Sequence, residues 1–257
     1  MWGGVSSEAA SQAIPKAFSL SDFFKPFQLP ISKVSSSDVL KALGKFLPVH
    51  YQKGVNVGIS GCPYHIGDFA QGGVIISLTH DGLHGLVAAI DDAKVGSTTI
   101  FKWEPAPTPP DDYTETTATN NDSLPFSTPN APYAQYYGGY KNQKVIEAIG
   151  NWQTTFPAFN AAAQYTKTVN GVTYDDWWLP SSTELSLMYA YRDVINQVSI
   201  ANGGSAFLND PATPPYSIYR SSRQYNPDDA WALNFFYGSQ DGGAKDDDVA
   251  VRCVRAF

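Results

Sequence analysis

The sequence has few charged residues and few of the groups that enzymes use for catalysis. Charged residues make up 16% of the chain, below the usual share of about 25%, and there are only four histidines. The motifs H-E-x-x-H, G-x-S-x-G and C-x-x-C, which mark zinc proteases, serine hydrolases and redox proteins, do not occur. We therefore expect neither an enzyme nor a protein with a cofactor.

The chain also lacks clustered positive charge, a long apolar run and a secretion signal. With a net charge of −7 and a pI near 5.0, it has no cluster of lysine and arginine for the phosphates of a nucleic acid. No apolar run approaches the roughly 20 residues that a membrane helix needs. Low charge with much Tyr, Ser, Asn and Gly is typical of exported proteins. We expect a cell-surface or extracellular protein whose signal or lipid-anchor segment is absent from this sequence.

The C-terminal segment, residues 216–257, contains six aspartates but no glutamate, methionine, histidine or threonine. Selection for a solvated acidic surface does not distinguish Asp from Glu, because both supply the same charge. A mutational rule that acts on codons does distinguish Asp from Glu. Randomising the adenines of an AAC codon yields Asp, Tyr, Phe, Gly, Ala, Ser, Leu, Val or Pro, but not Glu, Gln, Lys, Met or Trp. On that rule Gln224, Trp231, Gln240 and Lys245 are unvaried framework; the alternative is a turn-rich segment that favours Asp.

The spacing of apolar and turn residues predicts short strands at both ends of the chain and helices between them. We expect strands at 73–78, 85–90, 217–221, 230–235 and 249–254, with turns at Asn170-Gly171 and Gly242-Gly243. We expect helices at 39–47, 141–149 and 156–165, and one from Ser181 through Ile195 that starts with a capping box. Residues 104–132 read as a long loop. This order predicts an α+β fold, with helices on small twisted antiparallel sheets.

Three blocks of the sequence resemble a known family, in the family's order. Residues 66–90, IGDFAQGGVIISLTHDGLHGLVAAI, resemble the opening of a bacterial lectin-like domain, and residues 176–188, DWWLPSSTELSLM, are similar to its W-x-L-P-[ST]-x-x-E-L signature. Residues 220–257 resemble the variable region of proteins diversified by diversity-generating retroelements. In that family a reverse transcriptase copies a template repeat, with errors at adenines, into the 3′ end of a target gene.

The resemblance implies a C-type-lectin-like domain at 61–257, with a variable region at about 216–257 and an N-terminal extension at 1–60 that carries the short helix. Its ligand-binding face would consist of Arg220, Asp228, Asp229, Leu233, Phe236, Tyr237, Ser239, Asp241, Gly243, Ala244, Asp246, Asp247 and Asp248. Its framework would include Trp178, Trp231, Asn234, Phe235 and Gly238. Arg220 stands where the family pattern usually has Trp.

The expected partner is an unknown protein or glycan on another cell surface. Phe236 and Tyr237 are the expected hot spots, because rigid aromatic rings bury large areas at low entropic cost. The aspartates favour a basic partner. We expect a monomer without nucleic-acid ligands, attached to a membrane only through a lipid anchor. The alternatives are a non-diversified adhesin or glycan-binding module of the same fold and an enzyme of the formylglycine-generating type.

Two further features stay open at the level of sequence. In the implied fold the first and last strands pair, so Cys62 and Cys253 could form a disulfide; the alternative is two buried thiols. The carboxylates of 241–248 could bind Ca²⁺, but the segment lacks the EF-hand order, and we expect no metal. Arg252 and Arg255 alternate with valines, which places them on one strand face, where salt bridges could hold the sheet.

Overall fold

The computed structural model describes residues 64–79, 81–106, 117–124 and 134–257. All of them belong to one compact unit, Gly58–Phe257. Three predicted features lie outside the described residues: the N-terminal extension with its helix at 39–47, Cys62, and the parts of the long loop at 107–116 and 125–133.

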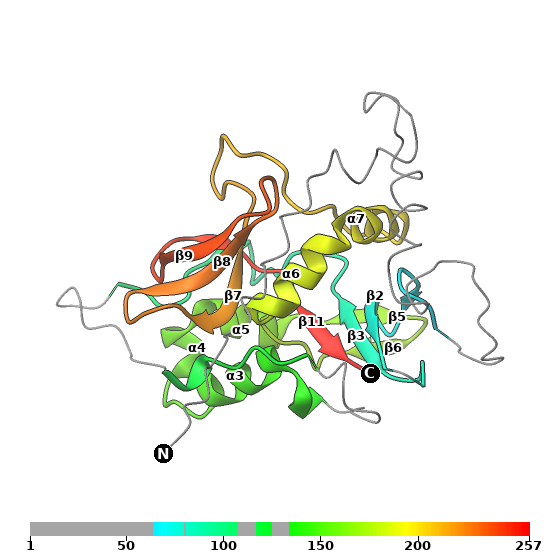
Figure 1. Cartoon of the computed structure of the whole chain (residues 1–257), viewed down its shortest axis with the longest axis horizontal. Helices are drawn as coiled ribbons and strands as arrows, with labels where there is room; N and C mark the ends of the chain where they lie inside the picture. Colours follow the sequence, from blue (N-terminus) through cyan, green and yellow to red (C-terminus); the bar gives the residue numbers. More distant parts are fainter. Residues whose placement is uncertain (1–63, 80, 107–116, 125–133) are drawn as a thin grey trace, which may run out of the picture. The chain divides into compact units, whose positions relative to one another are not determined.

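The described residues form an α+β fold, as predicted (Figure 1). The helices are η4 (Thr117–Thr119), η5 (Ala134–Tyr136), α3 (Gly138–Glu147), α4 (Trp152–Thr155), α5 (Pro157–Gln164), α6 (Ser182–Ala190) and α7 (Arg192–Ala201). The strands are β1 (Phe69–Ala70), β2 (Gly73–Leu78), β3 (Gly85–Ala88), β4 (Ile100–Phe101), β5 (Lys167–Val169), β6 (Val172–Tyr174), β7 (Ile218–Gln224), β8 (Asp229–Asn234), β9 (Gln240–Ala244), β10 (Val249–Ala250) and β11 (Val254–Ala256).

The strands form a sheet of order β1-β2-β3-β11, a sheet of order β4-β10-β7-β8-β9, and the hairpin β5-β6. The pairs are antiparallel except β10 with β7. The single strand predicted at 249–254 is wrong: its ends enter different sheets as β10 and β11. Between them Val251 and Cys253 accept backbone hydrogen bonds from Ala93 and Ala89, at 2.8 and 2.9 Å. The carbonyls of Val251 and Cys253 therefore keep hydrogen-bond donors where the chain passes from one sheet to the other.

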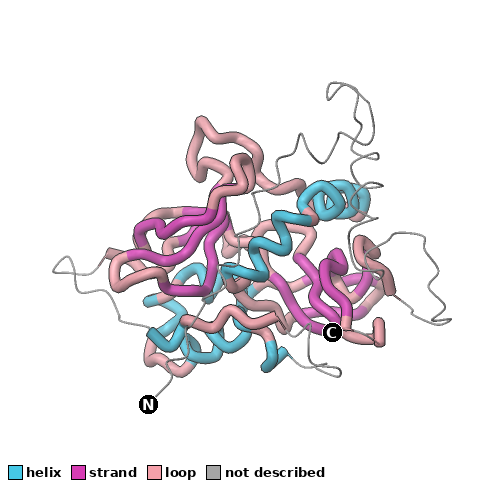
Figure 2. The backbone as a smooth tube through the Cα atoms, in the orientation of Figure 1, coloured by secondary structure: helices cyan, strands magenta, loops and turns pink. Residues whose placement is uncertain are grey.

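Helix α6 packs between the two larger sheets. Its Leu185 and Met188 share a buried cluster with Ile76 of β2 and Leu233 of β8, and Figure 2 shows the helix running between the two sets of strands. The predicted capping box is present, with Ser181 as N-cap and Glu184 at the third helical position. These contacts fix the five-stranded sheet against the core.

Two elements differ from the prediction. The helix expected to continue through Ile195 is interrupted at Tyr191, whose backbone leaves the helical conformation with φ −103° and ψ 11°, so that α6 ends at Ala190 and α7 begins at Arg192. The glycines expected in a turn lie inside β9 instead. A Cβ on Gly242 would stand 2.6 Å from the Tyr225 ring, so glycine there lets an aromatic ring lie against the strand.

Within the described part of the chain, none of the helices has the length and apolar character needed to cross a membrane.

Candidate ligand-binding face

The C-terminal segment builds a three-stranded meander, β7-β8-β9, that presents two different faces. Leu233 pairs with Tyr219 on one side and Gln240 on the other; Gln240 also donates to the Ser182 carbonyl of α6 at 3.2 Å. That face is turned to the helix. Because side chains alternate along a strand, neighbouring positions such as Ala232 belong to the opposite face.

The opposite face is hollowed. The hollow has a volume of about 180 Å³. Its lining residues are Ile218, Arg220, Ala232, Asn234, Ser239, Asp241, Gly242, Gly243, Asp247 and Val249. Cross-strand pairing places Ala232 opposite Asp241 and Ala230 opposite Gly243, so short side chains occupy the middle of the sheet and longer ones its border. Five residues of the predicted face line this hollow: Arg220, Ser239, Asp241, Gly243 and Asp247.

The turn between β8 and β9 displays two aromatic rings. Phe236 is 44% exposed and Tyr237 68%, and their rings meet edge to face at 4.8 Å. Asn234 Oδ1 accepts from both of their backbone N–H groups, at 2.9 and 3.0 Å, which is the role expected of a turn amide. Gly238 has φ +75°, and a Cβ there would lie 2.5 Å from Tyr189 Oη. Both framework positions thus shape the turn that holds the rings.

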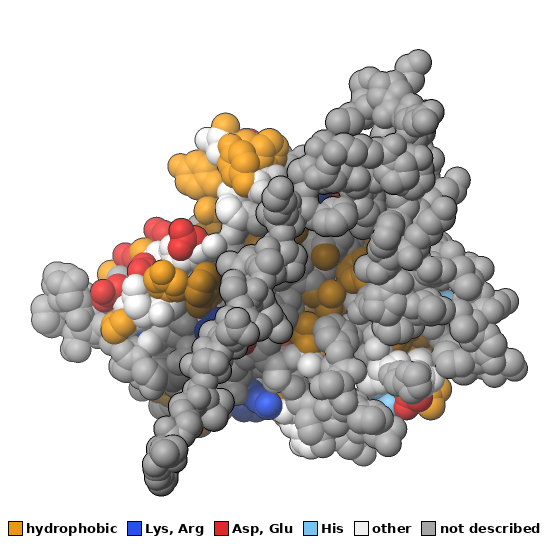
Figure 3. Space-filling model, in the orientation of Figure 1, with side chains coloured by type: hydrophobic (Ala, Val, Ile, Leu, Met, Phe, Trp, Pro, Cys, Tyr) orange, Lys and Arg blue, Asp and Glu red, His pale blue; other side chains and the backbone are white. Residues whose placement is uncertain are grey.

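The acidic residues of the segment lie on its surface. Four of them are exposed, namely Asp228, Asp241, Asp247 and Asp248, and two are half-buried, namely Asp229 and Asp246. Figure 3 shows acidic side chains beside a group of apolar ones at this end of the molecule. Among the described residues, no three His, Cys, Asp or Glu side chains form a group suited to a metal ion.

Two residues of the predicted face are buried, which corrects the prediction at these positions. Leu233 is 2% exposed and packs in the core. Arg220 is 1% exposed, and its terminal nitrogens donate to the carbonyls of Gly243 (3.2 Å), Ala244 and Asp247 (both 3.1 Å). Burial lowers the Arg220 pKa to about 10, opposed by nearby aspartates. Arg220 therefore forms the buried base of the hollow.

The residues that the codon rule treats as unvaried make structural contacts. Lys245, with a fully buried side chain, donates to Gln224 Oε1 at 3.0 Å and lies 3.7 Å from Glu104 Oε2. The Trp231 ring meets the Tyr225 ring at 4.7 Å. The contacts of Lys245 with Glu104 and of Gln240 with Ser182 of α6 join the three strands to the rest of the domain, whereas the Trp231 and Gln224 contacts hold the segment together.

The predicted framework tryptophan sits in a buried polar centre. Trp178 Nε1 donates to Glu184 Oε2 at 3.2 Å, and the carboxylate also accepts from the backbone N–H groups of Ser181 and Gly139, at 2.9 and 3.1 Å. Burial raises the Glu184 pKa to about 7, opposed by these donors. Ser181 and Glu184 of the W-x-L-P-S-x-x-E motif, together with Trp178 at its variable second position, thus form a structural joint that positions α6. Phe235, also in the predicted framework, is 4% exposed and lies in the same core cluster.

The end of the chain is held by buried arginines. Arg252 Nε donates to Asp92 Oδ1 at 2.6 Å, and Arg255 pairs with Asp176, so the predicted salt bridges are present. The prediction that both arginines lie on one strand face is wrong, because Arg252 lies between β10 and β11 and only Arg255 is in a strand. Cys253 between them is a buried free thiol, and burial raises its pKa. A reactive cysteine has the opposite environment, exposed and with a lowered pKa. Its predicted disulfide partner, Cys62, lies outside the described residues.

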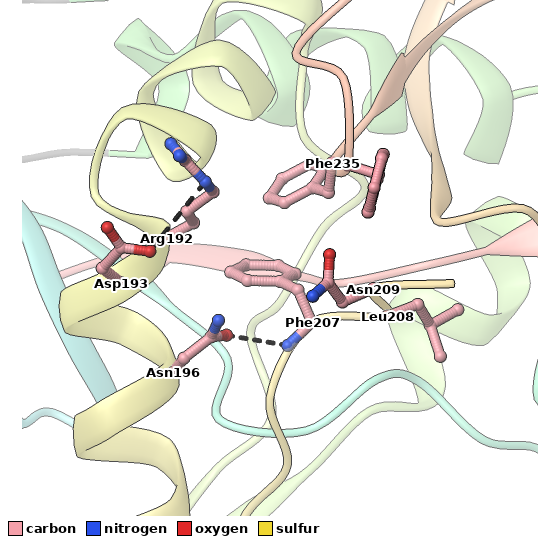
Figure 4. A pocket seen from close by; sticks show the side chains of 8 residues that line it. Arg192, Asp193, Asn196, Phe207, Leu208, Asn209 and Phe235 are labelled. Atoms are coloured by element: carbon pink, nitrogen blue, oxygen red, sulfur yellow. Dashed lines mark hydrogen bonds and ion pairs between the residues drawn. The ribbon is translucent and has the colours of Figure 1, made fainter. Parts of the chain in front are cut away.

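A second hollow, of about 250 Å³, adjoins the aromatic turn and was not predicted from the sequence. Its walls come from three segments, with Phe235 and Phe236 after β8, Phe207, and residues of α7. Figure 4 shows the Phe207 and Phe235 rings beside Arg192 and Asn196; the two ring centres lie 4.3 Å apart. The sequence carries no motif for this site, because only the fold brings the segments together.

Comparison with known proteins relates the C-terminal region to one family. Residues 141–255 match the family model of the Lcl C-terminal domain. No curated protein matches the chain significantly. Among solved structures, a fimbrial protein from Bacteroides ovatus ATCC 8483 is 16% identical, with a TM-score of 0.43, over 78% of this chain and 40% of that protein. This chain thus spans about two fifths of that protein's length.

The matched region contains all of β5 to β10 and all of the predicted face and framework. The family is one of binding domains in variable proteins and is not known for enzymes. The C-terminal part of this chain is therefore similar to the Lcl C-terminal domain, and this match supports the resemblance to variable proteins of diversity-generating retroelements that the sequence blocks indicated.

Proposed function

We propose that this protein is a surface-displayed receptor or adhesin whose C-terminal face is diversified by adenine-specific copying errors. The face consists of the outer side of β7-β8-β9, the aromatic turn, and the aspartates around them. In this proposal residues 61–257 form a C-type-lectin-like domain that acts as a monomer, with the extension 1–60 leading towards a lipid anchor. Its ligand is a protein or glycan of another cell.

The observation that carries the proposal is which residue types the C-terminal segment exposes. Its ten exposed residues are Tyr216, Tyr225, Pro227, Asp228, Phe236, Tyr237, Ser239, Asp241, Asp247 and Asp248. Tyr, Pro, Asp, Phe and Ser all arise from an AAC codon when only its adenines change. The exposed surface therefore has the composition that the codon rule predicts.

The residue types that the codon rule cannot produce are absent from that exposed surface. Gln224 and Lys245 are buried, and Trp231 and Gln240 are half-buried. In most proteins lysine and glutamine are among the most exposed residues, and Lys144 and Gln153 are exposed elsewhere in this structure. Natural selection for solubility does not explain why lysine and glutamine are buried or half-buried in this segment. A process that varies surface codons and leaves supporting codons unchanged does explain it.

The chemistry of the face suits recognition of many partners. Rigid aromatic rings among small polar residues are also what antibody paratopes use. The rings of Phe236 and Tyr237 stand on a turn whose geometry depends on Asn234 and Gly238, not on the rings themselves. The turn can therefore change its display residues and keep its shape.

A genomic observation tests the proposal. The genome that encodes this chain should hold, near a reverse-transcriptase gene, a second copy of codons 216–257 with AAC or AAT at the codons of exposed residues. The copy should match the gene at the codons of Gln224, Trp231, Gln240 and Lys245. If the source genome has no such template repeat, the diversification is disproved, and a fixed adhesin or glycan-binding module takes its place.

A further inference from the structure

We infer that the hollow on β7-β8-β9 receives a lysine or arginine side chain from a protein partner, while the aromatic turn covers an apolar residue beside it. This inference rests on the proposed function, because it uses the same face. It adds the chemistry of the partner: a basic residue next to an apolar one in an exposed peptide segment.

The dimensions of the hollow suit one long side chain. Its volume is about 180 Å³, enough for a single side chain and too small for a folded element. Ala232 and Gly243 leave its middle open, and Ile218 and Val249 add apolar surface at its border. The methylene stem of a lysine or arginine packs well on such surface while its charged end reaches a polar border.

The charges at the border favour a cation. Asp241 and Asp247 both line the hollow and are exposed. The cations of the C-terminal segment do not compete with a ligand for them, because Arg220, Lys245, Arg252 and Arg255 are buried and Arg223 is half-buried. The exposed surface of the segment thus carries only negative charge, which attracts a basic partner and repels an acidic one.

Arg220 forms the buried base of the hollow. Its side chain is 1% exposed, and its terminal nitrogens donate to the carbonyls of Gly243, Ala244 and Asp247. Its charge is opposed by four nearby aspartates, Asp229, Asp246, Asp247 and Asp248. Carboxylates therefore outnumber the one cation beneath the hollow, and a basic side chain remains favoured there.

The aromatic turn lies next to the hollow along the chain. Asn234 and Ser239 line the hollow and are joined by the backbone hydrogen bond from Asn234 N to Ser239 O, at 2.9 Å, that closes the turn. Phe236 and Tyr237 stand between these two residues. A partner segment with adjacent basic and apolar side chains therefore meets carboxylates and rings at once.

The test is selection of a random peptide library displayed on phage against the full chain, followed by titration of a selected peptide. Selected peptides should share a lysine or arginine beside an aromatic or aliphatic residue. Asp241→Asn and Asp247→Asn should each weaken binding by about threefold to tenfold. Asp175→Asn is the matched control: it removes the same charge from an exposed aspartate outside the proposed face and the hollow, and should leave the affinity within about twofold.

The substitutions keep the fold, because the side-chain amide oxygen that Asp241→Asn introduces can still accept the hydrogen bond that Asp241 receives from Gly242 N at 2.8 Å. Acetylating the basic residue of the peptide should abolish binding. Selected peptides without basic residues, an equal loss in the Asp175 variant, or no selected peptide would each overturn the inference. If peptides without basic residues bind but lose affinity on Phe236→Ala, the face is still a binding site and only its proposed partner is wrong. Binding that no residue of the face affects would also overturn the proposed function.

Discussion

The buried arginine near the C-terminus offers a quantitative test of how the face is supported. Arg252 has a fully buried side chain; its guanidinium bonds Asp92 and the carbonyls of Ala89, Ser205 and Ala206. Arg252→Met keeps most of the stem but leaves the Asp92 carboxylate, 19% exposed, without its cation. Breaking a buried pair in this way costs about 3–5 kcal/mol. For a domain of this size that loss lowers Tm by about 6–20 °C, at about 2–4 °C per kcal/mol.

The assay is thermal unfolding followed by circular dichroism. Adding Asp92→Asn to the Arg252→Met variant should recover part of the loss, because it removes the uncompensated charge. The control is Lys144→Met: that side chain is 51% exposed and pairs with Glu147 on the same helix, so Tm should change little. A Tm drop for Arg252→Met no larger than that of the control would refute the reasoning.

Three further predictions concern the framework and the face. In a urea titration, Gly238→Ala should destabilise the domain by about 1–3 kcal/mol, because φ is +75° and Tyr189 Oη is 2.5 Å from the new Cβ. Gly243→Ala is the control and should be close to neutral, because its Cβ would have its nearest contact at 3.7 Å. Burial raises the Glu184 pKa to about 7 from 4.5, so the folded state binds that proton more tightly than the unfolded state. The resulting stabilisation is complete below about pH 4.5 and is lost as the pH rises to about 7. Glu184→Gln should therefore flatten the decline in urea midpoint that the wild type shows between pH 5 and pH 8. Phe236→Ala and Tyr237→Ala should each weaken ligand binding by about tenfold or more at unchanged Tm, and an affinity within twofold of wild type would remove them from the site.

The sequence predicted the elements that depend on local chemistry. β2 has the predicted bounds because its apolar run ends at a hairpin turn, and the capping box at Ser181 and Glu184 forms from neighbours three residues apart. The turn at Asn170-Gly171 lies between β5 and β6, with positive φ at both residues. In each case residues close in sequence determine the conformation.

The predictions differ from the structure where residues distant in sequence determine the local conformation. Periodicity at 249–254 fits one strand, but partners at Phe101 and Ala88 draw its two ends into different sheets. Glycines at 242 and 243 read as a turn until Tyr225 is seen to occupy the space that a side chain would need. The composition of the segment predicted which residue types would be exposed, but not that Arg220 would lie beneath the face.

The most direct test of the account is deep sequencing of the 3′ end of this gene across a population of the source organism. The account predicts substitutions confined to template adenines and concentrated at the codons of exposed residues such as Phe236, Tyr237 and Asp241, with the codons of Trp231 and Lys245 unchanged. An invariant 3′ end, or substitutions spread equally over exposed and buried codons, would contradict the claim that this face is a diversified binding surface.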